Sequence, residues 1–103
     1  MPLMPLQKYQ SDAGADIFAP RSIHIRPGQR ALVDTGLTCA FPRTHWCLLK
    51  DKSSLALRHG LTMLGGVVDS NYHGRIQVIL HNLGSSPDTI PKYAPMCQAV
   101  LIP

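Results

Sequence analysis

Short apolar segments separated by frequent turn residues constrain the fold of this chain more than any other feature. The 103 residues include 9 prolines and 8 glycines, and Pro27-Gly28 is a strong turn dipeptide between two such segments. In Arg75–His81, apolar residues recur at every second position, which is the period of a β-strand. Strands are predicted at Ser22–Ile25, Arg30–Thr35, Leu37–Phe41, His45–Leu49, Arg75–His81 and Met96–Ile102.

Helical structure is limited in this sequence. The single helical candidate, Lys52–His59, makes at most two turns before Gly60, and the chain contains no glutamate, a residue favoured on helix surfaces. We therefore expect an all-β fold, a compact jelly-roll-like antiparallel β-sandwich of short strands. The length supports one core, so residues 1–103 are expected to form a single domain.

The charge and the cysteines restrict the possible partners and compartment. The formal net charge of +4 is scattered along the chain, which favours a local site for a small anion over a nucleic-acid interface. Cys39, Cys47 and Cys97 have neither zinc-ligand nor disulfide-framework spacing, which indicates a reducing compartment. Neither a signal peptide in Met1–Gln10 nor a membrane-spanning run is predicted. We expect an intracellular protein, in the cytoplasm or the nucleus, without membrane or nucleic-acid partners.

Two polar stretches are candidates for chemistry. In Asp12–Ile17, small residues surround two acids, a pattern that fits either a tight turn with a capping Asp or part of a site. In Lys50–Leu55, two lysines and two serines precede the possible helix, where free backbone N–H groups favour an anion. The alternative for this second stretch is an ordinary Ser-capped turn with solvated lysines.

A third stretch, Leu64–Ile76, predicts a β-hairpin with glycines that permit close approach of a ligand. Asp69 follows the apolar Val-Val pair and can act as a general base, and Tyr72 can stack on a flat or cyclic group. A plain hairpin loop is the alternative. The five histidines show no metal-ligand spacing, and neither a P-loop nor a G-x-S-x-G motif occurs.

Taken in order, these stretches resemble the motifs of the trimeric dUTP diphosphatase (dUTPase) family. The first motif, A-G-x-D-L, is similar to Ala13–Ile17, and the second, R-S-S/G-L-A, to Lys52–Ala56. The third, G-V-I-D-x-D-Y-x-G-x-I, is similar to Gly66–Ile76 and is the most specific of them. The fourth, G-D-R-I-A-Q, is matched only by Met96–Gln98.

The resemblance implies a dUTP diphosphatase that converts dUTP and water to dUMP and pyrophosphate. Asp69 is then the catalytic residue that activates the attacking water, and Tyr72 packs on the deoxyribose. The resemblance implies that substrate is bound by Lys52, Ser53, Ser54, Gly66, Val67, Val68, Tyr72, Ile76, Gln77 and Gln98. The serines, Lys52 and Gln98 hold phosphates, whereas the backbone at 66–68 and 76–77 reads the uracil edge.

The resemblance also implies a cofactor, a partner and an indirect role for one acid. Mg²⁺ is expected to be held mainly by the substrate phosphates, with no direct protein ligand. The bound partner is dUTP or a related deoxynucleotide, and the chain is expected to form a homotrimer with active sites between subunits. Asp16 is implied to orient a basic partner.

The sequence departs from the family pattern at four places, one of which is Asn71 in place of the second acid of the third motif. Lys52 stands where the second motif has arginine, Pro95 stands where the fourth has arginine, and the family's glycine-rich fifth motif has no match. Asp16 is therefore expected to lack the partner that it would orient, and activity is expected to be weak. The alternative is a catalytically impaired, dUTPase-derived trimer that acts as a nucleotide- or protein-binding module.

A deaminase of similar fold is excluded by composition. The dCTP deaminases carry a catalytic glutamate in the strand that follows the third motif. The matching position here is Ile79, and no glutamate occurs anywhere in the chain.

Overall fold

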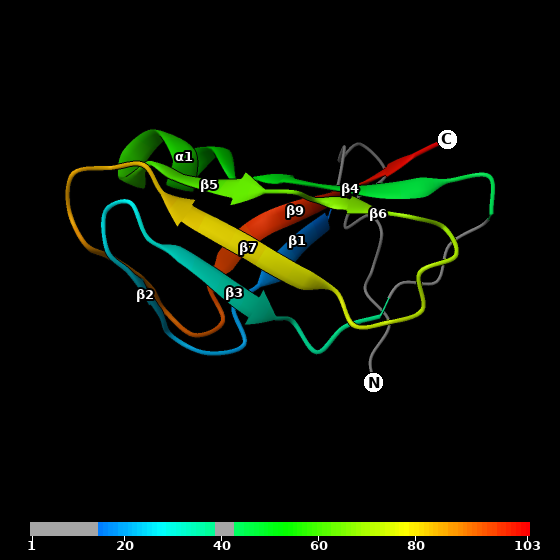
Figure 1. The fold of residues 1–103 in the computed structure, drawn as a ribbon, viewed down its shortest axis with the longest axis horizontal. Helices are drawn as coiled ribbons and strands as arrows, with labels where there is room; N and C mark the ends of the chain where they lie inside the picture. Colours follow the sequence, from blue (N-terminus) through cyan, green and yellow to red (C-terminus); the bar gives the residue numbers. More distant parts are fainter. Residues whose placement is uncertain (1–14, 39–42) are drawn as a thin grey trace.

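The computed structural model describes residues 15–38 and 43–103, which form nine strands and one short helix (Figure 1). The elements are β1 (Ala15–Phe18), β2 (Ile23–Ile25), β3 (Arg30–Asp34), β4 (Trp46–Asp51), α1 (Ser53–His59), β5 (Leu61–Leu64), β6 (Val67–Val68), β7 (Gln77–Asn82), β8 (Asp88–Ile90) and β9 (Pro95–Ile102). All strand pairs in these residues are antiparallel. The predicted all-β class is confirmed.

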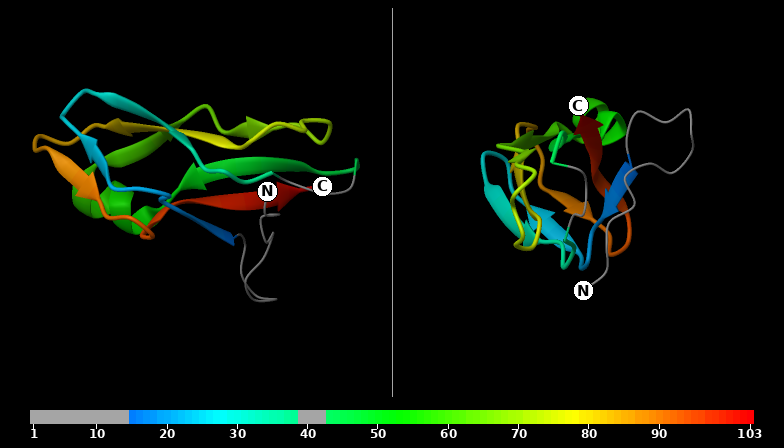
Figure 2. Two further views of the ribbon diagram at one scale, coloured as in Figure 1. Left: turned by 90° about the horizontal axis from the view of Figure 1, so that it is seen from below. Right: turned by 90° about the vertical axis from the view of Figure 1, so that its right-hand side faces the viewer.

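Two sheets and a two-stranded ribbon enclose one core. One sheet has the order β1-β9-β4-β6, the second has the order β3-β7-β5, and β2 pairs with β8. The β1-β9-β4 and β3-β7-β5 strands lie in two stacked layers (Figure 2). Apolar side chains from both layers and from the ribbon are buried together, among them Ile17, Ile25, Val33, Leu49, Leu80 and Ile90. This arrangement confirms the predicted β-sandwich.

Most of the predicted elements occur close to their expected positions. The segments predicted at 22–25, 30–35, 45–49, 75–81 and 96–102 correspond to β2, β3, β4, β7 and β9, and the predicted short helix is α1. Of the segment predicted at 37–41, positions 39–41 lie outside the described residues. The three- and four-residue strands β1, β5 and β8 were not predicted, because so few residues show no clear alternation.

The first acidic stretch is extended where the structure describes it. Ala15, Asp16 and Ile17 belong to β1 and pair with β9, so the tight-turn interpretation is wrong for these residues. Asp12, Ala13 and Gly14 lie outside the described residues. Burial explains the difference, because Ala15 and Ile17 point into the core while Asp16 points away from it.

The predicted hairpin at 64–76 is also corrected. Its two strands do not pair with each other: β6 pairs with β4, whereas β7 pairs with β3 and β5. The connection from β5 to β6 passes from one sheet to the other at Gly66. Gly66 permits this passage, because its φ is +113° and its C=O accepts a hydrogen bond of 2.7 Å from the Leu49 N–H. A Cβ at Gly66 would lie 2.6 Å from the Leu49 oxygen. A side chain is therefore excluded where the connection crosses from one sheet to the other.

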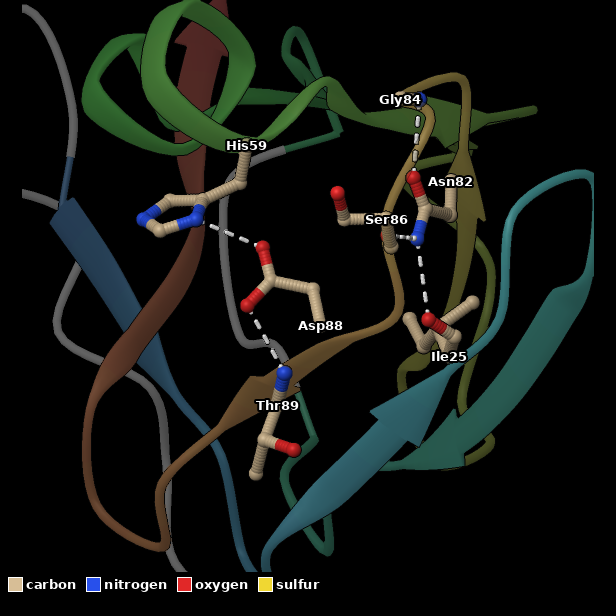
Figure 3. A network of polar contacts seen from close by, with 7 residues as sticks. All are labelled: Ile25, His59, Asn82, Gly84, Ser86, Asp88 and Thr89. Atoms are coloured by element: carbon tan, nitrogen blue, oxygen red, sulfur yellow. Dashed lines mark hydrogen bonds and ion pairs between the residues drawn. The ribbon is translucent and has the colours of Figure 1, made fainter.

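A buried amide joins β2, β7 and the loop before β8 (Figure 3). Asn82 is fully buried, and its Nδ2 donates to the main-chain oxygens of Ile25 at 2.9 Å and of Ser86 at 3.0 Å. Its side-chain oxygen accepts a bond of 2.8 Å from the Gly84 N–H. The single side chain thus satisfies three backbone groups between elements that share no ladder.

The helix is tied to β8 at its end. The His59 Nδ1 lies 2.7 Å from a carboxylate oxygen of Asp88, the first residue of β8. Figure 1 places α1 at the opposite end of the sandwich from the chain's C-terminus.

In the described residues no helix is long and apolar enough to cross a membrane.

Candidate functional site

A pocket of about 220 Å³ lies between β6 and the start of β7. Its lining residues are Val67, Val68, Asp69, Tyr72, Ile76 and Gln77. All six belong to the set predicted from the sequence, and Gly66 immediately precedes the first of them. The structure therefore brings the central part of the third motif around one small cavity.

The turn that carries Asp69 is fixed by its own hydrogen bonds. The Tyr72 N–H donates to the main-chain oxygen of Asp69 at 3.0 Å, and the Tyr72 hydroxyl donates to the main-chain oxygen of Arg75 at 2.7 Å. A Cβ at Gly74 would lie 2.6 Å from the Tyr72 hydroxyl oxygen. Glycine at this position therefore lets the tyrosine fold across the turn, where its ring is partly exposed to the pocket.

Backbone groups around the pocket differ in their availability to a ligand. The Ile76 N–H donates to Leu37 at 2.8 Å, and its C=O accepts from both the N–H and the hydroxyl of Thr35 at 3.1 and 2.7 Å. The main chain of Ile76 is therefore already hydrogen-bonded, and this residue offers the pocket its side chain. Val67 and Val68 pair with β4 and Gln77 pairs with Asp34 of β3, so the other side of each backbone is the candidate for reading a base edge.

The remaining predicted residues form a second group where β4 meets α1. Lys52 donates from Nζ to an Asp16 oxygen at 2.8 Å, and both side chains are about one-quarter to one-third exposed. Gln98 pairs with Asp16 on one side and with Lys50 on the other, which places it between β1 and β4. Ser53 and Ser54 are exposed at the start of α1.

The ion pair between Asp16 and Lys52 corrects one expectation. The sequence comparison left Asp16 without a cation, because Pro95 replaces the fourth-motif arginine. The structure supplies that cation from Lys52, which lies 36 positions along the chain and reaches Asp16 across β9, the strand between β4 and β1. Such a pair depends on which strands are neighbours, and no local pattern indicates it.

Burial, with a smaller contribution from two nearby acids, keeps a thiol beside this second group protonated. Cys97 is fully buried in β9. Burial, together with the negative charges of Asp16 and Asp51, raises the pKa of the Cys97 thiol to about 12. The thiol is neutral at physiological pH, so Cys97 is a packing residue and not a nucleophile.

The pocket and the second group lie apart within one chain. Val68 pairs with Cys47 on β4, and Lys52 follows Cys47 by five extended residues, or roughly 16 Å along the sheet. Neither Lys52 nor Asp16 lines the 220 Å³ pocket. A single chain therefore presents two separate halves of the predicted site.

Sequence reasoning missed two features close to these halves. A wider cavity of about 980 Å³ shares Val67 and Asp69 with the small pocket. Its other lining residues are Arg43, Thr44, His45, Trp46, Ser70, Asn71 and His73.

The second feature is the Asp51 carboxylate, which accepts hydrogen bonds from Thr62 and Met63 on β5. Both features bring together residues from separate segments, which no local pattern shows. The one available signal was that Asp51 directly precedes the second motif.

The chain is thus an all-β sandwich with a small pocket beside an exposed carboxylate and a separate lysine–serine cluster. The dUTPase family model matches residues 3–103. The deoxyuridine 5'-triphosphate nucleotidohydrolase of Clostridium novyi (strain NT) is 35% identical over 103 residues, covering 98% of this chain and 72% of that protein. The chain belongs to the dUTPase family.

Solved structures agree with this assignment. The native EIAV dUTPase superimposes with a TM-score of 0.89 at 30% identity, covering 94% of this chain and 80% of that one. A mutant dUTPase from phage phi11 of S. aureus, described with a structural Mg(II) ion, has a TM-score of 0.87 at 21% identity. It covers 97% of this chain and 82% of that one, and supports the fold alone.

Proposed function

We propose that this protein hydrolyses dUTP to dUMP and pyrophosphate. The observation that carries the proposal is the 220 Å³ pocket, in which Asp69 and Tyr72 lie with the backbone of Val67, Val68 and Gln77. The relatives reported above, which cover nearly the whole chain, are named as deoxyuridine triphosphate nucleotidohydrolases. The family resemblance assigns the same pocket to the deoxyuridine part of the substrate.

In this proposal Asp69 is the general base. Its carboxylate is exposed at the pocket, on a turn that two hydrogen bonds of Tyr72 hold in place. A fixed carboxylate can orient a water molecule and accept its proton as the water attacks the α-phosphorus. Phosphoryl transfer depends mainly on such positioning and on neutralisation of charge, rather than on covalent chemistry by the protein.

Selection of the base and sugar is assigned to the rest of the pocket. Backbone groups of Val67, Val68 and Gln77 read the uracil edge, and the buried Ile76 side chain forms an apolar wall. The Tyr72 ring packs against the deoxyribose. A 2′-hydroxyl would then meet the ring, so ribonucleotides are rejected sterically.

The phosphates are assigned to the second group of a neighbouring copy in a homotrimer. Lys52, which Ser53 and Ser54 follow, lies roughly 16 Å along the sheet from the pocket of its own chain, so a second copy is needed to complete a compact site with these residues and Gln98. Lys52 supplies a point charge and the serines supply hydroxyl donors. Asp16 orients the Lys52 ammonium through the 2.8 Å contact.

Mg²⁺ is proposed to arrive with the triphosphate. The described residues contain no group of three or more His, Cys, Asp or Glu side chains that could hold a metal ion. Mg²⁺ commonly keeps several waters and binds through substrate phosphates, which is the arrangement proposed here. When bound, the ion would neutralise phosphate charge.

One observation favours a second candidate function, a binding module that turns substrate over poorly. The Lys52 ammonium is already paired with Asp16, and Pro95 offers no guanidinium in place of the family arginine. A trimer of this kind could bind a deoxynucleotide or a protein with little hydrolysis.

Pyrophosphate release from dUTP, dTTP, dCTP and UTP, with and without Mg²⁺, tests both candidates. The wild-type chain is compared with Asp69→Asn and with Asp88→Asn, a control aspartate that lies outside the 220 Å³ pocket. Selective dUTP turnover that Asp69→Asn lowers by about 10²–10⁴-fold supports the enzyme. Folded protein that binds a non-hydrolysable dUTP analogue without turning dUTP over supports the binding module, and equal loss in both variants contradicts the role of Asp69.

A further inference from the structure

Asp51 connects three elements at the point where β4 ends. Its Oδ2 accepts a hydrogen bond of 2.6 Å from the Thr62 hydroxyl, and its Oδ1 accepts one of 2.6 Å from the Met63 N–H. Its backbone oxygen accepts a bond of 3.1 Å from the Gln98 side chain. Asp51 is itself half-buried, and the next residue is Lys52.

The carboxylate of Asp51 joins two different sheets. β4 belongs to the β1-β9-β4-β6 sheet, whereas Thr62 and Met63 lie on β5 in the β3-β7-β5 sheet. No ladder connects β4 with β5, so the side-chain bonds of Asp51 link the layers at this point. Hydrogen bonds to a charged acceptor are stronger than neutral ones, which suits a connection that must hold a turn in place.

The chain immediately after this connection carries the proposed phosphate-binding residues. Lys52 has an extended backbone, its oxygen accepts the first helical hydrogen bonds from Leu55 and Ala56, and its side chain makes no capping bond. The orientation of Ser53 and Ser54 therefore depends on where β4 ends. Asp51 fixes that point from one side and Gln98 fixes it from the other.

We propose that Asp51 is a positioning residue for the triphosphate, acting through Lys52, Ser53 and Ser54. The proposal rests on the proposed dUTP-hydrolysing function and adds a residue outside the four recognised motifs. Asp51 does not touch the substrate. Its two bonds to β5 keep the turn in the geometry that the phosphates require.

The test separates phosphate binding from binding of the nucleoside. Affinities for dUMP and for the α,β-imido analogue of dUTP are measured calorimetrically with Mg²⁺, together with kcat and KM for dUTP. The variants are Asp51→Ala, Asp51→Asn, Thr62→Val and Thr62→Ser. Asp88→Asn is the matched control, because Asp88 is a partly buried carboxylate that ties the other end of α1.

The expected pattern is selective. Asp51→Ala weakens binding of the triphosphate analogue and lowers kcat/KM by about ten- to a hundredfold, the range for a displaced binding group. It leaves the affinity for dUMP within about twofold, because the pocket at Val67–Gln77 is built without Asp51. Asp51→Asn stays close to wild type, since an amide can accept from Met63 and donate to the Thr62 hydroxyl.

Three results would overturn the proposal. These are a parallel loss of dUMP and analogue affinity in Asp51→Ala, an Asp51→Asn variant as impaired as Asp51→Ala, or an effect no larger than that of Asp88→Asn. If Asp51→Ala does not fold, Thr62→Val replaces it, with an expected weakening of a few-fold that Thr62→Ser restores. Wild-type protein that binds neither ligand overturns the proposed function as well, whereas wild-type turnover with unselective variants overturns the role of Asp51 alone.

Discussion

Replacement of the buried amide of Asn82 by alanine tests how the sandwich is held together. Asn82 is fully buried and makes three hydrogen bonds, to Ile25, Ser86 and Gly84 (Figure 3). Each hydrogen bond contributes about 1 kcal/mol net, and carbonyls left unsatisfied add a further cost. Asn82→Ala is therefore expected to lower the free energy of unfolding by about 3–5 kcal/mol. This is a large part of the roughly 5–15 kcal/mol that stabilises a small domain.

The measurement is urea-induced unfolding at one fixed protein concentration, because association of subunits would make stability depend on concentration. Asn82→Asp keeps the size and the acceptor for Gly84 but places an acceptor against the Ile25 and Ser86 carbonyls, so it is expected to destabilise at least as much as Asn82→Ala, because the buried carboxylate also loses hydration. The control is Gln29→Ala, which removes one exposed bond to the Arg26 N–H and is expected to cost less than about 1 kcal/mol.

Two results would refute this reasoning. Asn82→Ala could cost less than about 1 kcal/mol, or it could equal Gln29→Ala. Either result would mean that water or backbone rearrangement satisfies the Ile25 and Ser86 carbonyls without the amide. An unchanged m-value in all variants is required for the comparison to report stability alone.

Three further predictions concern the pocket and the core. Tyr72→Ala is expected to raise the ratio of UTP to dUTP turnover by about tenfold, because the ring no longer excludes a 2′-hydroxyl; an unchanged ratio in steady-state assays would contradict this role. Gly66→Ala is expected to destabilise the fold by about 1–3 kcal/mol, since its φ is +113° and a Cβ would meet the Leu49 oxygen at 2.6 Å. Thermal unfolding checks this, and a melting temperature equal to that of wild type would disprove it. The Cys97 thiol has its pKa raised by burial from 9.0 to about 12, so the unfolded state loses this proton first. The free energy of unfolding should then fall between pH 9 and 12 by up to about 1.4 kcal/mol per pH unit relative to Cys97→Ala, and parallel pH profiles would contradict the shift.

Local patterns predicted the strands that are long enough to repeat. β7 alternates fully buried and less buried residues over Gln77–Asn82, so it shows the two-residue period. β9, over Pro95–Ile102, is recognisable instead as a mostly apolar run of eight residues. The lining of the 220 Å³ pocket was also predictable, because its six residues lie within the eleven-residue third motif, Gly66–Ile76, and the position after it. These residues are close in the chain, so the sequence shows them as one group, although β4 and β3 fix where the two sides of the pocket lie.

Contacts between distant segments were decided by the tertiary structure. The sequence predicts that β6 and β7 form a hairpin, but Val67 and Val68 pair with β4 because the free edge of that strand accepts them. The Lys52 ammonium could equally have remained solvated, and it meets Asp16 only because β1 and β4 flank β9 in the same sheet. Asp51 likewise gains Thr62 and Met63 because the two layers stack at that point.

The sequence by itself thus determined the all-β class, the turn that carries Asp69 and the family. These depend on side-chain period and on short-range geometry, which are properties of neighbouring residues. The tertiary structure alone decided which sheet each strand joins, which carboxylate meets Lys52, and that the two halves of the site lie apart in one chain. Those features depend on strand order and layer stacking, and the free energy of such pairings is set by contacts between residues that the sequence places far from one another.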